Sequence, residues 1–495
     1  MIEFILNDQD IATDQSPGMT VLDFVRYHKD LKGTKIGCRE GDCGACTVLV
    51  GELVAQEIKY RTMTSCLMPL ANAAGKHIVT VEGINPDDGS LTPVQQAMVD
   101  TNGTQCGFCT VGFVMSLTGF CVDDTVKTPE MAVSSVDGNI CRCTGYKSIK
   151  RAAVCISVQL AASSKQSEPP AVAGGLTLAI AKQIVPKYFS DINERLASLR
   201  ATALKAETRP VESVSSHRAF VGGGTDIYVQ RPDTIVDEPV LHLFYDEQLR
   251  GIRDTGTHIE IGASATVTDL LVSPVMQSVF PQLYKHLKLV SSTPIRNMAT
   301  LAGNFVNASP IGDMTVWFLA LDAEITLEEC GSPHESKGAT RTMPLKDLYL
   351  GYKQLAKSPD EYITLIRFRK PTGDFRFNFE KVSKRTYLDI STVNTAISLT
   401  SSLPYKGGVA AASADGVVLS EVHVAAGGIA PIPLYLKETS AFLNGKAVSA
   451  ATVAQANEIM QSEISPISDV RGTEQYKRLL LRQLFQAHFV ELLDI

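Results

Sequence analysis

Hydrophobic residues at the start of the chain fall at every second position, as they do in a β-strand with one buried face. Ile2, Phe4 and Leu6 make up this first predicted strand. Further apolar stretches predict a helix over 21–30 capped by Thr20, strands over 46–50 and 77–81, and a tight turn at 51–52. This succession of short strands around one helix predicts a small β-rich domain over residues 1–85.

From residue 86 onward the apolar spacing changes to that of helices. Thr92 and Pro93 form a helix start, because threonine caps helices and proline is favoured at the first helical position. The helical pattern continues to residue 162 and predicts a second, helical domain over 86–162. Residues 163–177 are rich in Ser, Pro and Gly and lack an apolar period, so they are predicted to be a linker.

Beyond the linker, short strands and helices alternate and predict two further domains, over residues 178–350 and 351–495. The whole chain is therefore expected to be a multidomain α+β protein. Its 495 residues, 44% of them apolar and 20% charged, have an ordinary globular composition.

The charge and the apolar runs narrow the choice of partners. A formal net charge of −7 disfavours nucleic acid or an anionic membrane as the main partner. The sequence has no run of 18 apolar residues, the length that a membrane-spanning helix needs. Acidic residues near the N-terminus and the lack of a basic leader there predict a cytoplasmic location.

Nine of the eleven cysteines lie before residue 144, and the first four form a candidate metal site. Cys38, Cys43 and Cys46 have the spacing C-x4-C-x2-C, and Cys66 follows after nineteen further residues. Plant-type ferredoxins bind a 2Fe–2S cluster with this spacing. Structural zinc sites normally use two C-x2-C pairs or a C-x2-C/H-x3-H set. The spacing therefore favours iron–sulfur over zinc or unligated core cysteines.

A second set of four thiols lies in the predicted helical domain. Cys106 and Cys109 form a C-x2-C pair, and Cys141 and Cys143 form a C-x-C pair after thirty-one further residues. Spacing alone leaves zinc open, since C-x2-C also suits that ion. A second cluster is favoured because two redox centres in one chain indicate an electron path. The remaining cysteines are interpreted as small buried residues: Cys121, Cys155 and Cys330.

Two stretches of the third predicted domain are candidate nucleotide-binding loops. The first is an apolar strand that runs into Gly222-Gly223-Gly224 and then Thr225-Asp226. Exposed N–H groups at such a turn suit a phosphate, although the sequence is not G-x-G-x-x-G and a plain tight turn is the alternative. The second, residues 293–313, places polar residues among small neighbours that could surround a diphosphate and ribityl chain. Its alternative is a loop whose Asn and Ser side chains bond their own backbone.

Both cysteine sets, in this order and spacing, resemble the iron–sulfur part of the molybdenum hydroxylases, the family of xanthine dehydrogenase and aldehyde oxidase. The resemblance covers residues 1–160 and implies a β-grasp ferredoxin-like domain followed by a helical 2Fe–2S domain. It implies two ligand sets, Cys38, Cys43, Cys46 and Cys66 for the first cluster, and Cys106, Cys109, Cys141 and Cys143 for the cluster nearest the molybdenum. Gln105 matches a glutamine that bonds the pterin of the molybdenum cofactor. Val111 departs from the family, which usually has proline there.

The later stretches resemble the FAD-binding and C-terminal domains of the same family, with the α+β fold of vanillyl-alcohol oxidase and CO dehydrogenase flavoproteins. The resemblance implies FAD contacts by Val221, Gly222, Gly223, Gly224, Thr225, Asp226, Ile227, Thr300, Gly303, Asn304, Asn307, Ser309, Asp313 and Lys381. Lys381 would lie beside the flavin ring and is the only flavin-side candidate for catalysis. Without the resemblance, Lys381, Lys384 and Arg385 would be interpreted as an exposed basic cluster.

By this resemblance the chain is expected to be the iron–sulfur and FAD subunit of a xanthine dehydrogenase, an oxidoreductase of purine catabolism. In the family, a molybdenum centre on a large partner subunit converts hypoxanthine and xanthine to urate. Electrons then pass through the two 2Fe–2S clusters to FAD and NAD⁺. The chain would work in a hetero-oligomer such as α2β2. Its ferredoxin-like cluster would be the middle relay, partly covered by the FAD-binding domain.

Two alternatives remain open from the sequence. One is the same kind of subunit in a related molybdenum hydroxylase that acts on an aldehyde or an N-heterocycle. The other is a stand-alone iron–sulfur flavoprotein that carries electrons. Substrate choice belongs to the partner subunit, and the sequence does not indicate whether NAD⁺ or O₂ is the final acceptor.

Overall fold

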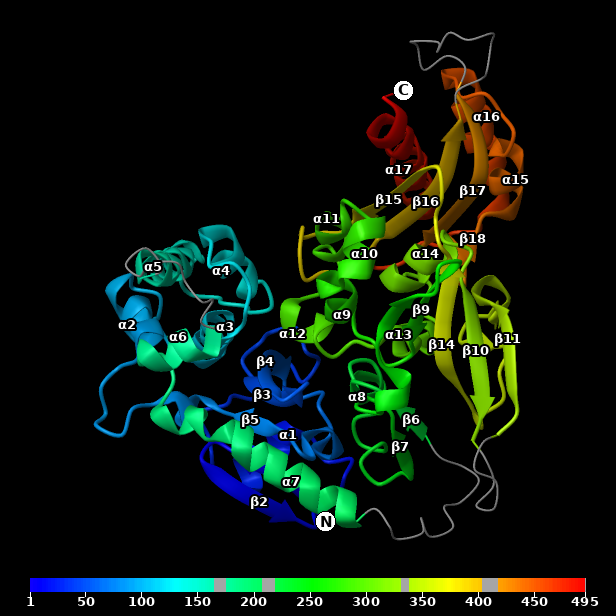
Figure 1. Ribbon diagram of the computed structural model, residues 1–495. Helices are drawn as coiled ribbons and strands as arrows, with labels where there is room; N and C mark the ends of the chain where they lie inside the picture. Colours follow the sequence, from blue (N-terminus) through cyan, green and yellow to red (C-terminus); the bar gives the residue numbers. More distant parts are fainter. Residues whose placement is uncertain (164–174, 207–218, 331–337, 403–416, 495) are drawn as a thin grey trace. The chain divides into compact units, whose positions relative to one another are not determined.

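The computed structural model describes residues 1–163, 175–206, 219–330, 338–402 and 417–494, which fall into two compact units (Figure 1). The first unit comprises Met1–Phe244 and Ser292–Ala299, and the second comprises Tyr245–Ser291 and Thr300–Ile495. Of the predicted linker 163–177, residues 164–174 lie outside the described residues, and a helix already begins at Gly175. Among the helices described, none is long and apolar enough to cross a membrane.

The first unit opens with a five-stranded mixed sheet in the order β2-β1-β5-β3-β4. The strands are β1 (Ile2–Leu6), β2 (Gln9–Thr13), β3 (Thr47–Val54), β4 (Glu57–Thr64) and β5 (His77–Val79). β1 and β5 run parallel, whereas the other neighbours are antiparallel. The helix α1 (Val21–Asp23) and a π-helical turn (Phe24–His28) precede the first cysteine loop. This mixed sheet with its single helical segment is the expected β-grasp arrangement.

The first strand lies where it was predicted, but its burial pattern differs from the prediction. Ile5, the residue expected on the open face, is fully buried, whereas Ile2 is partly exposed. Ile5 packs against Ile192 and Leu196 of α7 (Ile192–Ala206), which covers that face of the sheet. The expectation of one buried face was wrong because a helix far along the chain supplies the second cover.

The hairpin between β3 and β4 turns four residues later than predicted. The ladder pairs Gly51 with Tyr60 and continues to Val54 and Glu57, so residues 51–52 lie inside a strand. Ala55 and Gln56 form the turn instead, with φ values of 46° and 71°. Two consecutive positive φ values match the twist of a two-residue β-hairpin, a turn that usually contains Asn or Gly. Neither residue carries that signal, which explains why the turn was misplaced.

Predicted helix caps are confirmed at two positions. The Thr20 side chain accepts a hydrogen bond from the backbone N–H of Asp23 at 3.1 Å. At the start of α2 (Pro93–Asp100), Thr92 and Gln95 form a reciprocal capping box, with Pro93 at the first helical position. Each cap satisfies backbone donors that the first helical turn leaves without a partner.

The helical part of the first unit is built around one fully enclosed helix. The elements are α2, α3 (Thr110–Val122), α4 (Pro129–Ser135), α5 (Lys147–Ser163) and α6 (Gly175–Ala181). In α3 every residue from Gly112 to Val122 is buried, as expected for a helix surrounded by protein. Gly119 of this helix lies against Thr62 and Leu49 of the sheet, so one core serves both cysteine-bearing parts.

The rest of the first unit consists of short elements from later in the chain. They are α7, β6 (Ala219–Val221), α8 (Ile227–Gln230), β7 (Val240–His242) and α12 (Thr293–Arg296). Strands β6 and β7 pair in parallel. Helices α6 and α7 are separate, because Gln183 adopts a φ of 55° between them and Pro186 follows.

The second unit contains a five-stranded and a four-stranded sheet. The first has the order β11-β10-β14-β9-β8 and the second β15-β16-β17-β18, with a separate β12–β13 hairpin. Their bounds are β8 (Ile252–Asp254), β9 (His258–Gly262), β10 (Glu324–Glu329), β11 (Thr340–Pro344), β12 (Tyr349–Gly351), β13 (Gln354–Leu355), β14 (Glu361–Arg369), β15 (Asp374–Val382), β16 (Val393–Ser402), β17 (Val418–Gly427) and β18 (Leu434–Tyr435).

Helices complete both parts of the second unit. They are α9 (Val267–Val272), α10 (Pro274–Val279), α11 (Leu283–Leu287), α13 (Leu301–Asn307), α14 (Asp313–Leu319), α15 (Lys437–Leu443), α16 (Ala450–Glu463) and α17 (Glu474–Leu493). Helices α15, α16 and α17 share a core with the four-stranded sheet. In this core Leu443, Met460 and Phe485 pack with Ile397 and Val424. The mixture of sheets and helices confirms the predicted α+β class.

Candidate iron–sulfur and flavin sites

The four thiols of the first predicted ligand set are arranged as two pairs. Cys38 pairs with Cys43, and Cys46, directly before β3, pairs with Cys66 in the loop between β4 and β5. Backbone N–H groups also point at the sulfurs: Glu40 donates to Cys38 Sγ at 3.3 Å, and Cys38 donates to Cys43 Sγ at 3.4 Å. Such donors stabilise negative charge on sulfur and tune the potential of a cluster.

The second ligand set is paired in the same way. Cys106 Sγ and Cys143 Sγ lie 3.6 Å apart, and Cys109 pairs with Cys141. Thr144 donates to Cys141 Sγ from its backbone N–H at 3.5 Å and from its hydroxyl at 3.2 Å. The four thiols come from the start of α3 and the loop before α5.

Pairs of thiols suit a two-iron cluster, in which four cysteines serve two irons. In the described part of the chain, no group of three His, Cys, Asp or Glu side chains is arranged to hold a single metal ion. A tetrahedral zinc site would need its four ligands to surround one point. The paired arrangement therefore fits 2Fe–2S clusters.

One thiol in each pair has a lowered pKa and therefore ionises more readily than its partner. The hydrogen bond from Cys43 lowers the pKa of Cys38 to about 5, and the hydrogen bond from Cys66 lowers the pKa of Cys46. A backbone hydrogen bond from Phe108 lowers the pKa of Cys106. Burial opposes ionisation of Cys141, but hydrogen bonds from Thr144 lower its pKa overall. Thiolates are the form in which cysteine binds metals.

The two cysteine loops are joined to each other by hydrogen bonds. The backbone N–H of Ile140 donates to the carbonyl of Cys43 at 3.0 Å. Asn139 donates from Nδ2 to the carbonyl of Gly44 at 3.1 Å and accepts from the Ser116 hydroxyl at 2.7 Å. Gly44 has a φ of 66°, and a Cβ there would lie 2.3 Å from the carbonyl oxygen of Gly138. Glycine is thus required where the two loops touch.

The cysteines outside the ligand sets are only partly as predicted. Cys121 is fully buried in α3, which confirms its interpretation as a core residue. Cys155 and Cys330 are partly exposed, so the expectation that they are buried was wrong. Cys155 lies on a side of α5 that also carries the exposed Val158. Cys330 directly follows the end of β10 and donates its backbone N–H to the carbonyl of Asp360 at 2.9 Å.

The glycine loop, defined as residues 222–225, has unused backbone donors. It connects β6 to the short segment before α8, and its residues Gly223 and Gly224 are buried. Within the described residues, no protein group accepts a hydrogen bond from the N–H of Gly223, Gly224 or Thr225. Buried N–H groups without a partner are rare in proteins, and successive ones form a concave site for anions. The loop therefore fits the diphosphate of FAD.

The second predicted FAD stretch belongs to the second unit from Thr300 onward, and the polar side chains of this part have partners within the protein. Thr300 caps α13 by accepting from Gly303 at 3.2 Å, and Asn304 accepts from the Thr315 hydroxyl at 3.0 Å. The side-chain oxygen of Asn307 accepts from Lys353 at 2.8 Å. The Ser309 hydroxyl accepts from the backbone N–H of Ile311 at 3.5 Å. These contacts show that the side chains shape the loop.

Lys381 and Asp313 form a buried ion pair in the second unit. Lys381 Nζ lies 2.7 Å from Asp313 Oδ2 and 2.8 Å from the carbonyl of Leu289, and the lysine side chain is only 1% exposed. Asp313 Oδ1 also accepts from Ser391 at 2.7 Å and from Asn394 at 2.5 Å. The interpretation of Lys381 as part of an exposed basic cluster is therefore wrong, although Lys384 and Arg385 are exposed.

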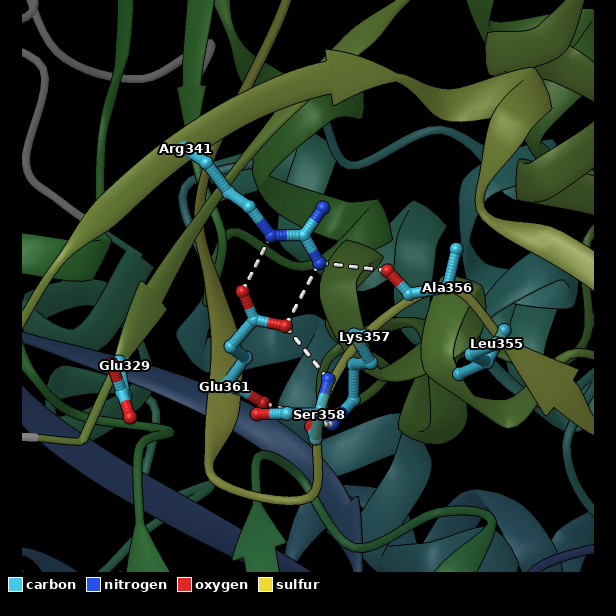
Figure 2. Close-up of a pocket in the computed structure, with 7 residues that line it drawn as sticks. All are labelled: Glu329, Arg341, Leu355, Ala356, Lys357, Ser358 and Glu361. Atoms are coloured by element: carbon cyan, nitrogen blue, oxygen red, sulfur yellow. Dashed lines mark hydrogen bonds and ion pairs between the residues drawn. The ribbon is translucent and has the colours of Figure 1, made fainter.

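A cavity of about 550 Å³ in the second unit contains none of the predicted site residues (Figure 2). Arg341 binds Glu361 through two contacts of 2.6 and 2.8 Å, and its guanidinium also donates to the carbonyl of Ala356 at 2.7 Å. Lys357 donates to the carbonyls of Ser358 and Glu361, at 2.8 and 2.9 Å. Burial lowers the pKa of Lys357. Arg341 and Glu361 pair with each other and Lys357 bonds backbone carbonyls, so these three charges stabilise the loop.

Sequence reasoning missed several residues that hold these sites in shape. Neither Asn139 nor Asn394 was predicted to have a role. Both are buried polar residues whose side chains bond distant parts of the chain. Their partners lie 95 and 81 positions away, a separation that no local motif reports.

Four family models match the chain in succession. A 2Fe–2S iron–sulfur cluster binding domain matches residues 4–71, and a [2Fe–2S] binding domain matches 80–154. An FAD binding domain in molybdopterin dehydrogenase matches 194–370, and a CO dehydrogenase flavoprotein C-terminal domain matches 379–492. The chain therefore carries two 2Fe–2S domains followed by an FAD-binding domain.

Several curated proteins are similar over most of this chain. Xanthine dehydrogenase of Emericella nidulans is 28% identical over 509 residues, which cover 90% of this chain and 35% of that protein. Xanthine dehydrogenase 1 of Arabidopsis thaliana is 27% identical, with 93% and 37% covered. The chain thus spans little more than a third of these relatives. A solved CO dehydrogenase from Hydrogenophaga pseudoflava, which lacks the Mo-pyranopterin moiety, is 25% identical over 59% of this chain and 92% of that one, with a TM-score of 0.48.

The paired thiols, the glycine loop and the four matching domains define an iron–sulfur flavoprotein with two 2Fe–2S centres and one FAD. More particularly, the chain belongs to the molybdenum hydroxylase family. It corresponds to the electron-transfer region of the xanthine dehydrogenase-like members. The predicted family, fold class and cofactors are confirmed at this level.

Proposed function

We propose that this chain is the iron–sulfur and FAD subunit of a xanthine dehydrogenase, which passes electrons from a molybdenum centre on a partner subunit to NAD⁺. The observation that carries the proposal is that both thiolate sets lie in one unit. They are joined by the hydrogen bond from the backbone N–H of Ile140 to the carbonyl of Cys43. When bound, 2Fe–2S clusters carry single electrons and FAD accepts two, so the chain holds the groups needed to receive electrons singly and deliver them in pairs.

Exposure supports different roles for the two ligand sets. Cys106 and Cys143 are exposed, and the neighbouring Gln105 and Phe108 are exposed beside them. In the first set, Cys46 and Cys66 are buried. We therefore assign the second set to the side that faces the partner's molybdenum cofactor, where Gln105 would bond the pterin. The first set is assigned to the internal relay.

A residue from the FAD-binding range packs against the first cysteine loop. Gly41 has a φ of 80° and is buried, and a Cβ there would lie 2.7 Å from both Leu67 and Ile295. Ile295 belongs to α12, inside the range that matches the FAD-binding model. This cover supports a relay that exchanges electrons within the protein instead of with a diffusible carrier.

Proposed FAD contacts are the residues implied by the sequence resemblance. In the first unit they are Val221, Gly222, Gly223, Gly224, Thr225, Asp226 and Ile227, and in the second unit Thr300, Gly303, Asn304, Asn307, Ser309, Asp313 and Lys381. The free N–H groups of the glycine loop support the first assignment. In the second unit, Lys381 is fixed by Asp313 and Leu289, so it would present a stationary positive charge.

Cofactor and partner analysis tests the proposal. The tagged chain, purified from its own cells, should contain about four irons and one FAD and should retain a molybdenum-bearing partner. The complex should reduce NAD⁺ with xanthine. Turnover with an aldehyde or another N-heterocycle but not with xanthine would favour a related molybdenum hydroxylase. Full turnover without molybdenum would favour a stand-alone electron carrier.

Substitution of one ligand tests the iron–sulfur assignment separately. Cys106→Ser should remove one of two low-temperature EPR signals of the reduced protein and leave the other. Cys155→Ser is the matched control, because Cys155 lies in the same helical part but belongs to neither set. Persistence of both signals in Cys106→Ser would contradict the assignment.

A further inference from the structure

The glycine loop is held by the residues that directly follow the cluster ligand Cys66. Asn72 donates from Nδ2 to the carbonyl of Gly222 at 3.2 Å, and Asn72 itself is only 2% exposed. The carbonyl of Leu67 faces Gly224, where a Cβ would lie only 2.4 Å from that oxygen. Gly224 has a φ of 87°, a conformation that other residues rarely adopt. Residues 67–72 therefore set the shape of the loop from one side.

The other side of the loop rests on α12 and its C-terminal neighbour. A Cβ on Gly223 would lie 1.8 Å from the carbonyl oxygen of Met298, so the two backbones are in direct contact. Met298 is itself tied to the sheet, because the hydroxyl of Thr64 lies 3.5 Å from its sulfur. Thr64 ends β4, two residues before Cys66. The segment from Thr64 to Asn72 thus contacts one side of the glycine loop directly and the other side through Met298, and it includes a cluster ligand.

Further contacts keep this arrangement in place. The hydroxyl of Tyr228, in α8 directly after the loop, donates to the carbonyl of Gly18 at 2.8 Å. The Ser16 hydroxyl donates to the carbonyl of Val236 at 2.8 Å. All of these residues belong to the first unit. The ferredoxin-like domain therefore provides the surface against which the first FAD-binding loop is folded.

We propose that Asn72 and Leu67 of the ferredoxin-like domain are positioning residues for FAD, and that assembly of the Cys66 cluster and binding of FAD strengthen each other. The inference rests on the proposed function of the glycine loop and adds residues outside the FAD-binding range. Asn72 and Leu67 act on the backbone of the loop, whose N–H groups are left free for the diphosphate.

The physical basis is the cost of ordering the loop. A loop that is already fixed loses less conformational entropy when it binds a ligand, so fixing it raises affinity. A bound cluster would hold Cys66 and, through the adjoining segment, Leu67 and Asn72. By linkage, if the cluster raises the affinity for FAD, then FAD must raise the affinity for the cluster by the same factor.

Asn72→Ala tests the positioning role directly. The full-length protein is freed of FAD and titrated with FAD, and binding is followed by quenching of flavin fluorescence. Loss of the hydrogen bond to Gly222 should weaken FAD binding about tenfold, the value of one net hydrogen bond. Iron content and both EPR signals should stay at the wild-type level. Asn193→Ala is the matched control, because Asn193 Nδ2 also donates to a backbone carbonyl of the ferredoxin-like domain, that of Gln56 at 3.0 Å, away from the loop.

Substitutions of the cluster-ligating cysteines test the coupling between the Cys66 cluster and FAD. They also test the proposal if Asn72→Ala does not fold. Cys66→Ser should lose one EPR signal and bind FAD at least fivefold more weakly, the lower end of typical coupling between sites. Cys106→Ser should lose the other EPR signal and bind FAD within twofold of wild type. Equal FAD affinity in wild type, Asn72→Ala and Cys66→Ser would overturn the inference. A wild-type protein that binds no FAD would instead contradict the proposed function.

Discussion

Ile140 donates its backbone N–H to the carbonyl oxygen of Cys43 at 3.0 Å, so a residue adjoining one cluster ligand bonds a ligand of the other set. Asn139 reinforces this link with two side-chain hydrogen bonds, to Gly44 and from Ser116. The residue is only 4% exposed, so its partners have little access to water. The geometry of each cysteine loop therefore depends on the other.

Asn139→Ala should destabilise the first unit and reduce the iron bound at both sets. Removal of the amide leaves the buried Ser116 hydroxyl without its acceptor, at a cost of about 1 to 3 kcal/mol in the free energy of unfolding. The measurement is urea denaturation together with iron content per chain. Asn85→Ala, at an exposed position whose side chain bonds only Gln95 in the described residues, should change neither quantity.

Gly224→Ala should lower the free energy of unfolding more than the same change at another glycine with the same backbone conformation. Gly224 and Gly256 have φ values of 87° and 89°, but only Gly224 faces an atom, the Leu67 oxygen, that a Cβ would strike. Gly256→Ala should cost about 1 kcal/mol through backbone strain alone. Gly224→Ala should cost clearly more and should also reduce FAD content. Equal losses of thermal stability in the two variants would show that the contact with Leu67 is unimportant.

Asp313→Asn should strongly destabilise the second unit, because it leaves the buried Lys381 ammonium without its counter-charge. Breaking one partner of a buried pair typically costs about 3 to 5 kcal/mol. Trp317, the chain's single tryptophan, is buried in α14 beside Asp313 in sequence, so its fluorescence reports unfolding of this unit.

A surface ion pair in the same unit provides the control for this loss. Lys370 Nζ lies 2.6 Å from Asp254 Oδ2, with the two side chains 38% and 34% exposed. Lys370→Met should cost less than about 1 kcal/mol, because solvent screens such pairs. If Asp313→Asn cost no more than Lys370→Met, the buried pair would have no structural role.

The second unit should lose stability on acidification through two buried histidines. Asn378 links them, accepting from His286 at 3.1 Å and donating to His488 Nδ1 at 3.0 Å, while His488 Nε2 lies 2.7 Å from the Thr395 hydroxyl. Burial lowers the pKa of His488 to about 3 and that of His286 to about 4. In the unfolded chain both would titrate near pH 6.5.

The sign of the effect follows from these pKa values. Below about pH 6.5 the unfolded chain binds protons that the folded unit does not, so the free energy of unfolding falls as pH falls. Each histidine contributes up to about 1.4 kcal/mol per pH unit between pH 6.5 and its folded pKa. His488→Gln should make the dependence less steep by that amount in urea denaturation from pH 7 to pH 5. His258→Gln, at a partly exposed position on β9, is the control variant.

The cysteine spacings and the helix caps were predictable because they are local. Cys38 to Cys46 span nine residues, and the Thr92–Gln95 capping box spans four, so the sequence itself contains the geometry. The turn at Ala55 and Gln56 was not predictable, because neither residue carries the usual signal for positive φ.

Contacts between distant segments were beyond the reach of the sequence. Ile5 is covered by α7, almost two hundred positions later, and Lys381 is neutralised by Asp313. A period of two or a cluster of basic residues describes one segment and says nothing of the partner that buries it. For the same reason Asn72 gave no signal: its role depends on the carbonyl of Gly222, 150 positions away.

The division of the chain into units has a consequence for its biosynthesis. Residues 292–299 belong to the first unit, although residues 245–291 of the second unit precede them. During translation, the ferredoxin-like domain cannot complete its packing until Met298 has left the ribosome, even though domains at the N-terminus generally fold first. A truncated product that stops at residue 244 would expose the surfaces that Ile295 and Met298 normally cover. Cluster insertion into a nascent chain would therefore be expected only after that point.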